Sequence, residues 1–304
     1  MRISTRNEYG TLKSVIVGSV ENFQWPDNDL EFDKSILRST YHKKLKDKTP
    51  KSDVLLEAQD DLNSLVTILQ NKGVEVHRPI INGPHWSYSA RDILLTIGNK
   101  VIQCPTPYSS RANEIDMYPF LLEADTEIIK APRPHHVDDA MFDAANVLKL
   151  DDKLLYSLSH SANEAGADWL QKQVGTDFEV IKWQVVDHAI THIDSTILSV
   201  AKDTVIVNAA RVKDNQLPSF MKNYNKIWIE DVAPLAFEYF PYASKWIGMN
   251  VLSIDPDTVI IDSNQIKISE QLQSHGFNII PADMRQARTL GGGFHCVTCD
   301  LERQ

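Results

Sequence analysis

Residues 196–207, TILSVAKDTVIV, carry the pattern from which the fold can be predicted. An apolar strand, a short polar turn and a second apolar strand follow one another here, and this pattern predicts a β-hairpin. The same pattern recurs at residues 92–102 (DILLTIGNKVI), 146–156 (NVLKLDDKLLY) and 250–261 (NVLSIDPDTVII). The turns begin near positions 98, 151, 201 and 255, and a spacing of about fifty residues indicates a chain built from repeated units.

Helical stretches lie between the hairpins, and each is followed by another strand. Residues 53–72, 167–173 and 268–274 have the apolar spacing of helices that pack on one face. The strands expected after them are residues 74–76, 178–181 and 277–280.

The two ends of the chain supply a fifth unit. We expect residues 12–17 (LKSVIV) to join residues 296–299 (CVTC), which would close a ring of repeats and remove exposed strand edges. The alternative is an ordinary α+β domain with several similar hairpins. Residues 40–52 and 106–118 are polar and irregular, which predicts loops, and no boundary divides the expected single domain, 1–304.

The composition argues against several classes of partner. The 304 residues include 31 Lys and Arg against 41 Asp and Glu, a formal charge of −10, whereas proteins that bind nucleic acids or anionic membranes are normally basic. We expect neither partner. No run approaches the roughly 18 apolar residues of a membrane span, and the start lacks the apolar stretch of a secretory signal, so we expect a cytoplasmic location. Three cysteines cannot make a disulfide framework.

The residues that open the hairpins would meet if the hairpins surround a common axis. One thiol, one imidazole and several carboxylates at equivalent positions of successive units form a candidate active site. These residues are Asp92, Asp143 or Asn146, His192 with Asp194, Asn250 and Cys296.

Cys296 lies in residues 291–299, GGGFHCVTC. A C-x-x-C redox centre needs a helix after it, but the chain ends soon after Cys299. A zinc site would want two more ligands at suitable spacing, and Cys104 with a histidine is a poor substitute. The glycines are not a P-loop, because neither Lys-Ser/Thr nor a helix follows them. A nucleophilic thiol closely approached by the backbone remains, with a structural cysteine as the alternative.

His192 and Asp194 are two residues apart, so on an entering strand they would share a face and could both meet a substrate. Asp143 could orient the imidazole through its second nitrogen. The alternative for His192 is a structural role, and for Asp92, Asp143 and Asp194 it is turn or cap formation.

Carboxylates around a thiol suggest a planar, cationic substrate. A guanidinium presents a fork of N–H donors that carboxylates match with paired hydrogen bonds. Holding it in this way would bring its central carbon within reach of the sulfur. Attack would then give a covalent amidino-thioether.

At several motifs the sequence resembles the amidinotransferase family, whose founding member is arginine:glycine amidinotransferase, within the pentein superfamily of guanidine-modifying enzymes. The resemblance extends from residue 8 to the C-terminus. The motifs are residues 8–18 (EYGTLKSVIVG), 90–92 (ARD), 142–145 (FDAA), 192–196 (HIDST), 244–246 (SKW), 249–252 (MNVL) and 291–300 (GGGFHCVTCD).

The resemblance implies an α/β fold that is a five-bladed propeller, with five ββαβ units around a pseudo-fivefold axis and the active site on that axis. Cys296 then matches the nucleophile, His192 the general acid and base, and Asp143 the carboxylate that orients His192. Arginine would give its amidino group to Cys296 and leave as ornithine, and a second amine would attack the intermediate. This chemistry implies no metal and no organic cofactor.

The resemblance also implies a substrate-binding set. Asp92 and Asp194 match the residues that clamp the guanidinium, Arg211 matches the group that binds the donor's α-carboxylate, and Ser244 matches a hydroxyl near the nucleophile. Asn250 completes the set.

The chain departs from the family at informative places. Members that use glycine carry Asn-Pro-Met before the HID motif, whereas residues 189–191 are AIT. We therefore assign acceptor specificity to Ala189 and Thr191, and expect an amine other than glycine. The chain also lacks an excursion between residue 134 and Phe142, which could open the pocket. Asn146 replaces a family Asp without removing a catalytic group.

Three hypotheses follow. The first is an L-arginine-dependent amidinotransferase with small-molecule substrates and an unassigned amine acceptor. The second is a guanidine hydrolase of the same fold, similar to arginine deiminase or a dihydrolase, in which water resolves the adduct. The third is a non-catalytic binding protein, against which the intact Cys, His and three Asp residues argue. Family members also make a homodimer possible.

Overall fold

The computed structural model describes residues 1–24, 49–83, 86–185, 192–238 and 243–304. These residues form five three-stranded sheets of one plan, in which the middle strand pairs antiparallel with one neighbour and parallel with the other. In four of the sheets a hairpin provides the antiparallel pair. The four predicted hairpins are confirmed. Four sheets consist of β3 (Leu94–Ile97), β4 (Lys100–Gln103) and β5 (Glu127–Lys130); β6 (Val147–Leu150), β7 (Lys153–Leu158) and β8 (Glu179–Gln184); β9 (Ile197–Ala201), β10 (Thr204–Asn208) and β11 (Asn225–Ile229); and β12 (Leu252–Asp255), β13 (Thr258–Asp262) and β14 (Asn278–Ala282).

The fifth sheet joins the two ends of the chain, as predicted. Its middle strand β1 (Leu12–Val17) pairs antiparallel with β15 (Thr298–Arg303) and parallel with β2 (Glu75–His77). The C-terminal strand begins at Thr298, two residues later than the sequence suggested. Cys296 therefore precedes the strand, in a turn closed by the Val297 N–H, which donates to the Gly293 carbonyl at 3.0 Å.

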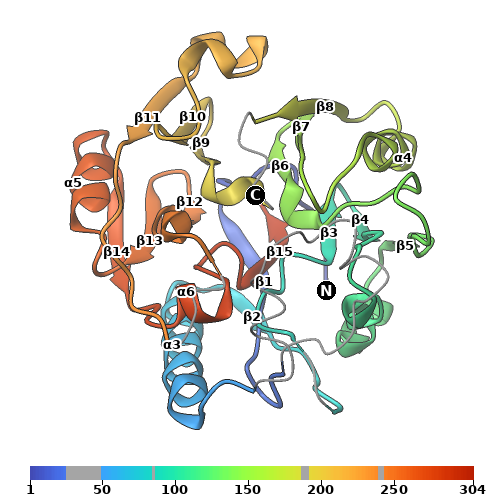
Figure 1. Cartoon of the computed structure of the whole chain (residues 1–304), viewed down its shortest axis with the longest axis horizontal. Helices are drawn as coiled ribbons and strands as arrows, with labels where there is room; N and C mark the ends of the chain where they lie inside the picture. The colour runs from blue at the N-terminus through green and yellow to red at the C-terminus, as the bar shows by residue number, and fades with distance from the viewer. Residues whose placement is uncertain (25–48, 84–85, 186–191, 239–242) are drawn as a thin grey trace.

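Neighbouring sheets contact one another in succession. Contacts join β15 to β3, β6 to β9, β9 to β12 and β12 to β1. Figure 1 shows the sheets following one another around the middle of the molecule, in their order along the chain. The apolar core fills the spaces between them, as where Leu148, Leu198 and Val259 from three successive sheets belong to one buried cluster.

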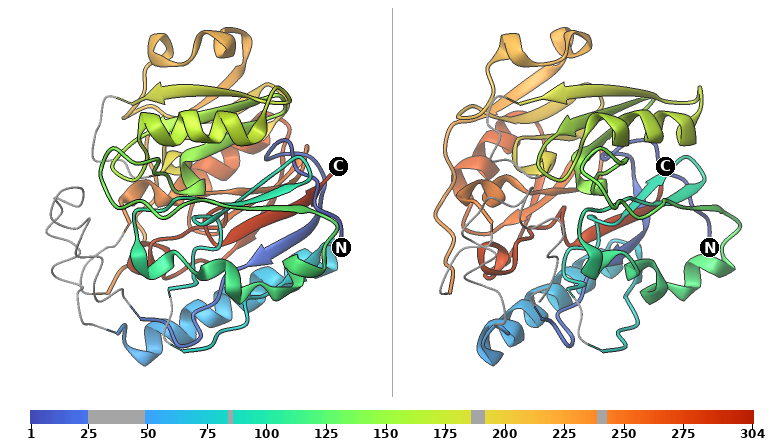
Figure 2. Two further views of the ribbon diagram at one scale, coloured as in Figure 1. Left: turned by 90° about the vertical axis from the view of Figure 1, so that its right-hand side faces the viewer. Right: turned by 45° about the vertical axis from the view of Figure 1, so that its right-hand side comes forward.

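Helices cover the outer sides of three sheets. They are α3 (Ser52–Asn71), α4 (Glu164–Val174) and α5 (Ile266–Ser274), which confirm the three predicted helices, and a short α6 (Ala287–Leu290) precedes the C-terminal turn. The buried side chains of α3, among them Leu62, Leu65 and Leu69, recur at helical spacing. Figures 1 and 2 place α3 at the end of the molecule opposite the β9–β11 sheet. None of the helices described is both long and apolar enough to cross a membrane.

The remaining connections use 3₁₀ turns in place of helices. Residues 106–118, expected as a loop, contain the short turns η1 (Ser109–Arg111) and η2 (Glu114–Met117). The segment also contributes buried charges, because Arg111 and Glu114 are 2% and 3% exposed. Their charges are buried because they pair with each other and with a carboxylate of the candidate site. Most of residues 40–52 lies outside the described residues.

Candidate active site

The candidate site is built where successive sheets begin. Asp92 stands just before β3, Asp143 before η4 (Ala144–Asn146) and β6, His192 before η5 (Ile193–Ser195) and β9, Asn250 after η8 (Lys245–Met249) and before β12, and Cys296 before β15. The segment η4 contacts η5, and η5 contacts η8. The repeated position in each unit thus brings together side chains that are far apart in the sequence.

His192 lies between two carboxylates. Its Nε2 is 3.0 Å from Asp143 Oδ2, and its Nδ1 is 3.7 Å from Asp92 Oδ1. Thr106 Oγ1 donates to the other oxygen of Asp143 at 2.7 Å. Burial lowers the pKa of His192, but the charges of Asp92, Asp143 and Asp194 and the hydrogen bond to Asp143 outweigh it and raise the pKa to about 9. The imidazole is therefore held protonated near neutral pH.

Cys296 is the buried thiol of the site, with 2% exposure. Its Sγ donates to Asp194 Oδ2 at 3.0 Å, and its backbone N–H donates to Asn250 Oδ1 at 3.0 Å. Burial and the negative charges of Asp194 and Asp92 raise the pKa of Cys296 well above its usual value. Without a bound cation, the sulfur therefore rests as a thiol.

The glycines before Cys296 allow the backbone to pass close to the site. A Cβ on Gly293 would lie 2.7 Å from the Cβ of Asn250, and a Cβ on Gly292 would lie 3.2 Å from that of Cys296. Side chains at these positions would displace Asn250 or Cys296. The close approach of the backbone expected from the sequence is confirmed.

The expectation that His192 and Asp194 share one face of a strand was wrong. Residues 193–195 form the 3₁₀ turn η5, and with three residues per turn, side chains two apart diverge. His192 consequently faces Asp143 and Asp92, whereas Asp194 faces Cys296 and His295. The turn thus places Asp194 beside the thiol of Cys296 and directs the imidazole of His192 toward Asp143 and Asp92.

Asp92 is supported by a buried ion pair that sequence reasoning missed. Arg111 donates to Asp92 Oδ2 at 2.5 Å and to both oxygens of Glu114 at 2.7 and 2.9 Å. The other oxygen, Asp92 Oδ1, is buried without a hydrogen-bond partner among the described residues. Burial raises the pKa of Asp92 and raises that of Glu114 to about 7. The Arg-x-x-Glu spacing was a signal, but nothing in the sequence connected it to Asp92.

Arg211 and Ser244 contact each other at 3.1 Å. Arg211 Nη1 also donates to the carbonyl and hydroxyl of Ser195 at 3.0 and 2.8 Å. The guanidinium is therefore anchored to the turn that carries Asp194. Asn146 Nδ2 donates to Ser159 Oγ, and its Oδ1 accepts from the Ser161 hydroxyl and from the backbone N–H of Asp143 at 3.1 Å. Asn146 therefore holds the backbone of Asp143 in place. Ala189 and Thr191 lie outside the described residues.

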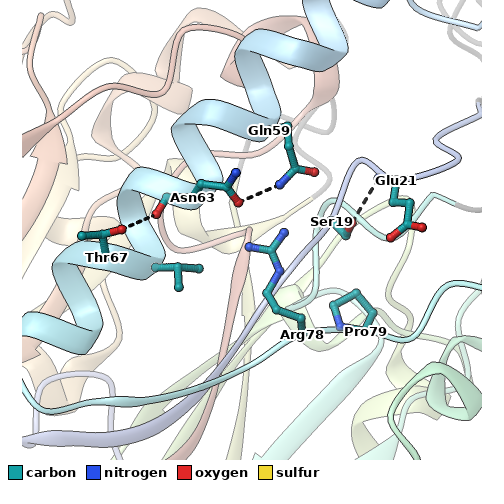
Figure 3. A pocket seen from close by; sticks show the side chains of 8 residues that line it. Ser19, Glu21, Gln59, Asn63, Thr67, Arg78 and Pro79 are labelled. Atoms are coloured by element: carbon teal, nitrogen blue, oxygen red, sulfur yellow. Dashed lines mark hydrogen bonds between the residues drawn. The ribbon is translucent and has the colours of Figure 1, made fainter.

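The described residues contain no group of three His, Cys, Asp or Glu side chains arranged to hold a metal ion. A separate pocket of about 500 Å³ lies beside α3 (Figure 3). Much of its polar lining is bonded internally, because Gln59 donates to Asn63 Oδ1 and Thr67 to the Asn63 carbonyl. The pocket contains none of the residues expected in the active site. Its lining residues are Ser19, Glu21, Gln59, Asn63, Val66, Thr67, Arg78 and Pro79.

Comparisons with known proteins agree with this fold. The family model of eukaryotic N,N dimethylarginine dimethylhydrolase matches residues 30–303. Inosamine-phosphate amidinotransferase 1 of Streptomyces griseus is 33% identical, over 99% of this chain and 97% of its own. A solved structure of the inosamine-phosphate amidinotransferase from that organism has a TM-score of 0.92 at 32% identity, with 99% and 97% covered. An amidinotransferase of Microseira wollei in the saxitoxin biosynthetic pathway has a TM-score of 0.86 at 25% identity, with the same coverage.

The fold is that of the pentein superfamily of guanidine-modifying enzymes. Within that superfamily, the chain belongs to the amidinotransferase family. The family expected from the sequence motifs is thus confirmed.

Proposed function

We propose that the protein transfers the amidino group of L-arginine, through a covalent amidino-cysteine at Cys296, to an amine other than glycine, and releases ornithine. One observation carries the proposal: a buried thiol bonded to Asp194 and an imidazole flanked by Asp92 and Asp143 stand at the starts of the sheets in an amidinotransferase-family chain. We take the five sheets as the blades of a propeller around a pseudo-fivefold axis, in one domain over 1–304.

Donor binding would use Asp92 and Asp194, the two carboxylates whose negative charges act on the thiol. The unbonded Oδ1 of Asp92 is available to a guanidinium N–H, and Asp194 already lies at hydrogen-bond distance from the sulfur. A cation bound between them offsets the negative charges that raise the pKa of Cys296. The thiol is thereby activated only when the donor is present.

The first half-reaction forms an S–C bond and breaks the C–N bond to the ornithine side chain. Protonated His192 supplies a proton to the leaving nitrogen, which departs as a neutral amine. The proton that Cys296 loses then restores the imidazolium, so charge and protons balance. His192 can serve as this acid because Asp143 and Asp92 raise its pKa to about 9.

The second half-reaction reverses these bonds with a new amine. The acceptor nitrogen attacks the amidino carbon, the C–S bond breaks, and the proton lost by the nitrogen returns through His192 to the sulfur. Two relatives are named for acceptors larger than glycine: inosamine phosphate in Streptomyces griseus, and L-lysine in a Pseudomonas savastanoi enzyme that is 26% identical over 99% of this chain and 94% of its own. They support an acceptor larger than glycine.

A hydrolase is the second candidate. The family model that matches residues 30–303 is that of a dimethylarginine hydrolase, and water could resolve the same covalent adduct. The two activities use the same thiol, imidazole and carboxylates, and they differ in how well water is kept from the adduct.

The function is tested by intact-protein mass spectrometry after the protein is mixed with L-arginine and quenched in acid. We expect a mass increase of about 42 Da from amidination of a thiol, which added amines discharge as ornithine accumulates. Steady formation of citrulline, or of ornithine without an acceptor amine, would instead establish the hydrolase. The absence of both adduct and product would refute arginine as the donor.

Arg211→Ala tests recognition of the donor's carboxylate. If Arg211 binds that group, the KM for L-arginine should rise by about 10- to 100-fold, the worth of a charge-assisted hydrogen bond. The KM for agmatine, which lacks the carboxylate, should change little. Arg133→Ala, at an exposed arginine, is the control. Equal losses for arginine and agmatine would remove this role from Arg211.

A further inference from the structure

His295, the residue before the proposed nucleophile Cys296, has no role in the proposed mechanism, although its ring lies between two carboxylates. It is buried, with 4% exposure. Its Nδ1 is 3.0 Å from Asp194 Oδ2, the same oxygen that accepts from Cys296 Sγ at 3.0 Å. Its Nε2 lies 3.5 Å from Glu8 Oε2. Both ring nitrogens thus face carboxylates, and one of those carboxylates touches the sulfur.

We propose that His295 is a positioning residue of the active site, which holds Asp194 ionised and correctly oriented beside the sulfur of Cys296 by a hydrogen bond from Nδ1. On the other side of the ring, the charge of Glu8 faces Nε2 at 3.5 Å, although no hydrogen bond joins the two groups among the described residues. The inference rests on the proposed function, because Asp194 is there one of the two carboxylates that hold the donor guanidinium.

Asp194 needs such a partner because it is buried. An isolated carboxylate out of water favours its neutral form, and a neutral Asp194 could not pair with a cation. Burial raises the pKa of Asp194, but the hydrogen bond and charge of His295 are the largest opposing influences and lower it below its usual value. His295 therefore preserves the negative charge that donor binding requires.

Glu8, the carboxylate that faces the other side of the His295 ring, is held in place by two buried cations. Glu8 Oε2 pairs with Arg91 at 3.1 Å, and Glu8 Oε1 lies 3.8 Å from Lys149 Nζ. The same two cations pair with Asp300 at 2.8 and 3.5 Å. Burial raises the pKa of Glu8, but Lys149 and Arg91 outweigh it and lower the pKa to about 2. Glu8 thus remains charged behind the imidazole.

Arg91 also holds the backbone of His295 in place. Its Nε donates to the His295 carbonyl at 2.8 Å, so one guanidinium orients both the main chain of His295 and the carboxylate that faces its ring. The ionisable groups around His295 are then Asp194, Glu8, Cys296, and, one contact further, Arg91, Lys149 and Asp300. This network connects the N-terminal segment to the nucleophile.

Two substitutions of His295, by Asn and by Gln, distinguish a role in positioning Asp194 from a role in packing alone. The side-chain N–H of Asn can replace the Nδ1 donor of His295, whereas the longer Gln side chain places its N–H nearer the Nε2 position. We expect His295→Asn to keep kcat/KM for L-arginine within about fivefold of wild type. His295→Gln should lose about 100-fold, mainly as an increase in KM, since a hydrogen bond to a buried charge is lost. His275→Asn, on an exposed residue after α5, is the matched control.

A second measurement follows the thiol directly and needs no arginine. The ionised Asp194 is one cause of the raised pKa of Cys296. If Asp194 becomes neutral in His295→Gln, the ultraviolet absorbance of the thiolate, measured against Cys296→Ala, should develop at lower pH than in wild type. His295→Asn should titrate like wild type.

The inference is overturned if folded His295→Gln retains the kinetics and thiol titration of wild type, or if His295→Asn is impaired as severely as His295→Gln. Circular dichroism and the melting temperature establish folding. Should His295→Gln not fold, Glu8→Gln replaces it, with a smaller loss in kcat/KM and the same direction of thiol shift expected; no change in that variant overturns the inference. If wild type forms no arginine adduct, the proposed function fails, whereas the thiol titration still decides whether His295 controls Asp194.

Discussion

Cys296→Ala should lower arginine-dependent turnover by at least about 10⁴-fold, because no other group can form the covalent intermediate once the nucleophile is removed. The mass increase with L-arginine should disappear as well. The circular dichroism spectrum and melting temperature should stay near wild type, since the turn is held by hydrogen bonds from its backbone amides, including that from the Cys296 N–H to Asn250 Oδ1. Steady-state kinetics and mass spectrometry measure both losses.

Cys299→Ala is the matched control for this prediction. Cys299 is also buried, but its Sγ lies in β15 and donates to the Leu94 carbonyl at 3.4 Å. Its removal should leave the adduct and most of the activity. Substantial turnover by Cys296→Ala, or an equal loss in both variants, would exclude Cys296 as the nucleophile.

Asp143→Asn should reduce kcat by about 100- to 10,000-fold, the range associated with a general acid that loses its correct orientation or protonation. The substitution removes one of the charges that raise the pKa of His192 to about 9. Because the protonated imidazole is the proposed acid, wild-type activity should fall as the pH rises through about 9. In Asp143→Asn this fall should occur at lower pH.

The pH dependence of kcat and of kcat/KM checks this prediction. Asp125→Asn, which removes an exposed carboxylate outside the site, should show the wild-type profile. If Asp143→Asn loses activity with no displacement of its alkaline limb, the pairing of Asp143 with His192 does not control the protonation of the imidazole.

Much of the fold could be predicted because its signals are local. Each hairpin has its apolar strands and polar turn within about twelve residues, and the repetition of this pattern makes the assignment robust. The helix α3 was equally visible from its apolar spacing. The start of β15 was misplaced by two residues, since the turn at Cys296 depends on a hydrogen bond to Asn250, 46 positions away in the sequence.

The candidate site was only partly predictable. The residues that open the hairpins, among them His192 and Cys296, could be named because the repeat marks equivalent positions. The sequence alone did not reveal Arg111 and His295, which act through carboxylates that are distant in the chain. A buried charge has to be paired, but a sequence does not say which partner will lie within 3 Å of it.

The repeated units and the family could be predicted from the sequence alone, because strand pairing within a hairpin and the motif residues depend on short spans of chain. The closure of the two ends could be predicted because each end supplies part of one further unit of the repeat. The tertiary structure decided how charge is distributed around the thiol. In the folded protein Asp194 contacts Cys296 and His295, whereas His192 lies between Asp143 and Asp92. The physical reason is that pairing energies and pKa shifts depend on distance and burial, which are fixed only when successive sheets pack against one another.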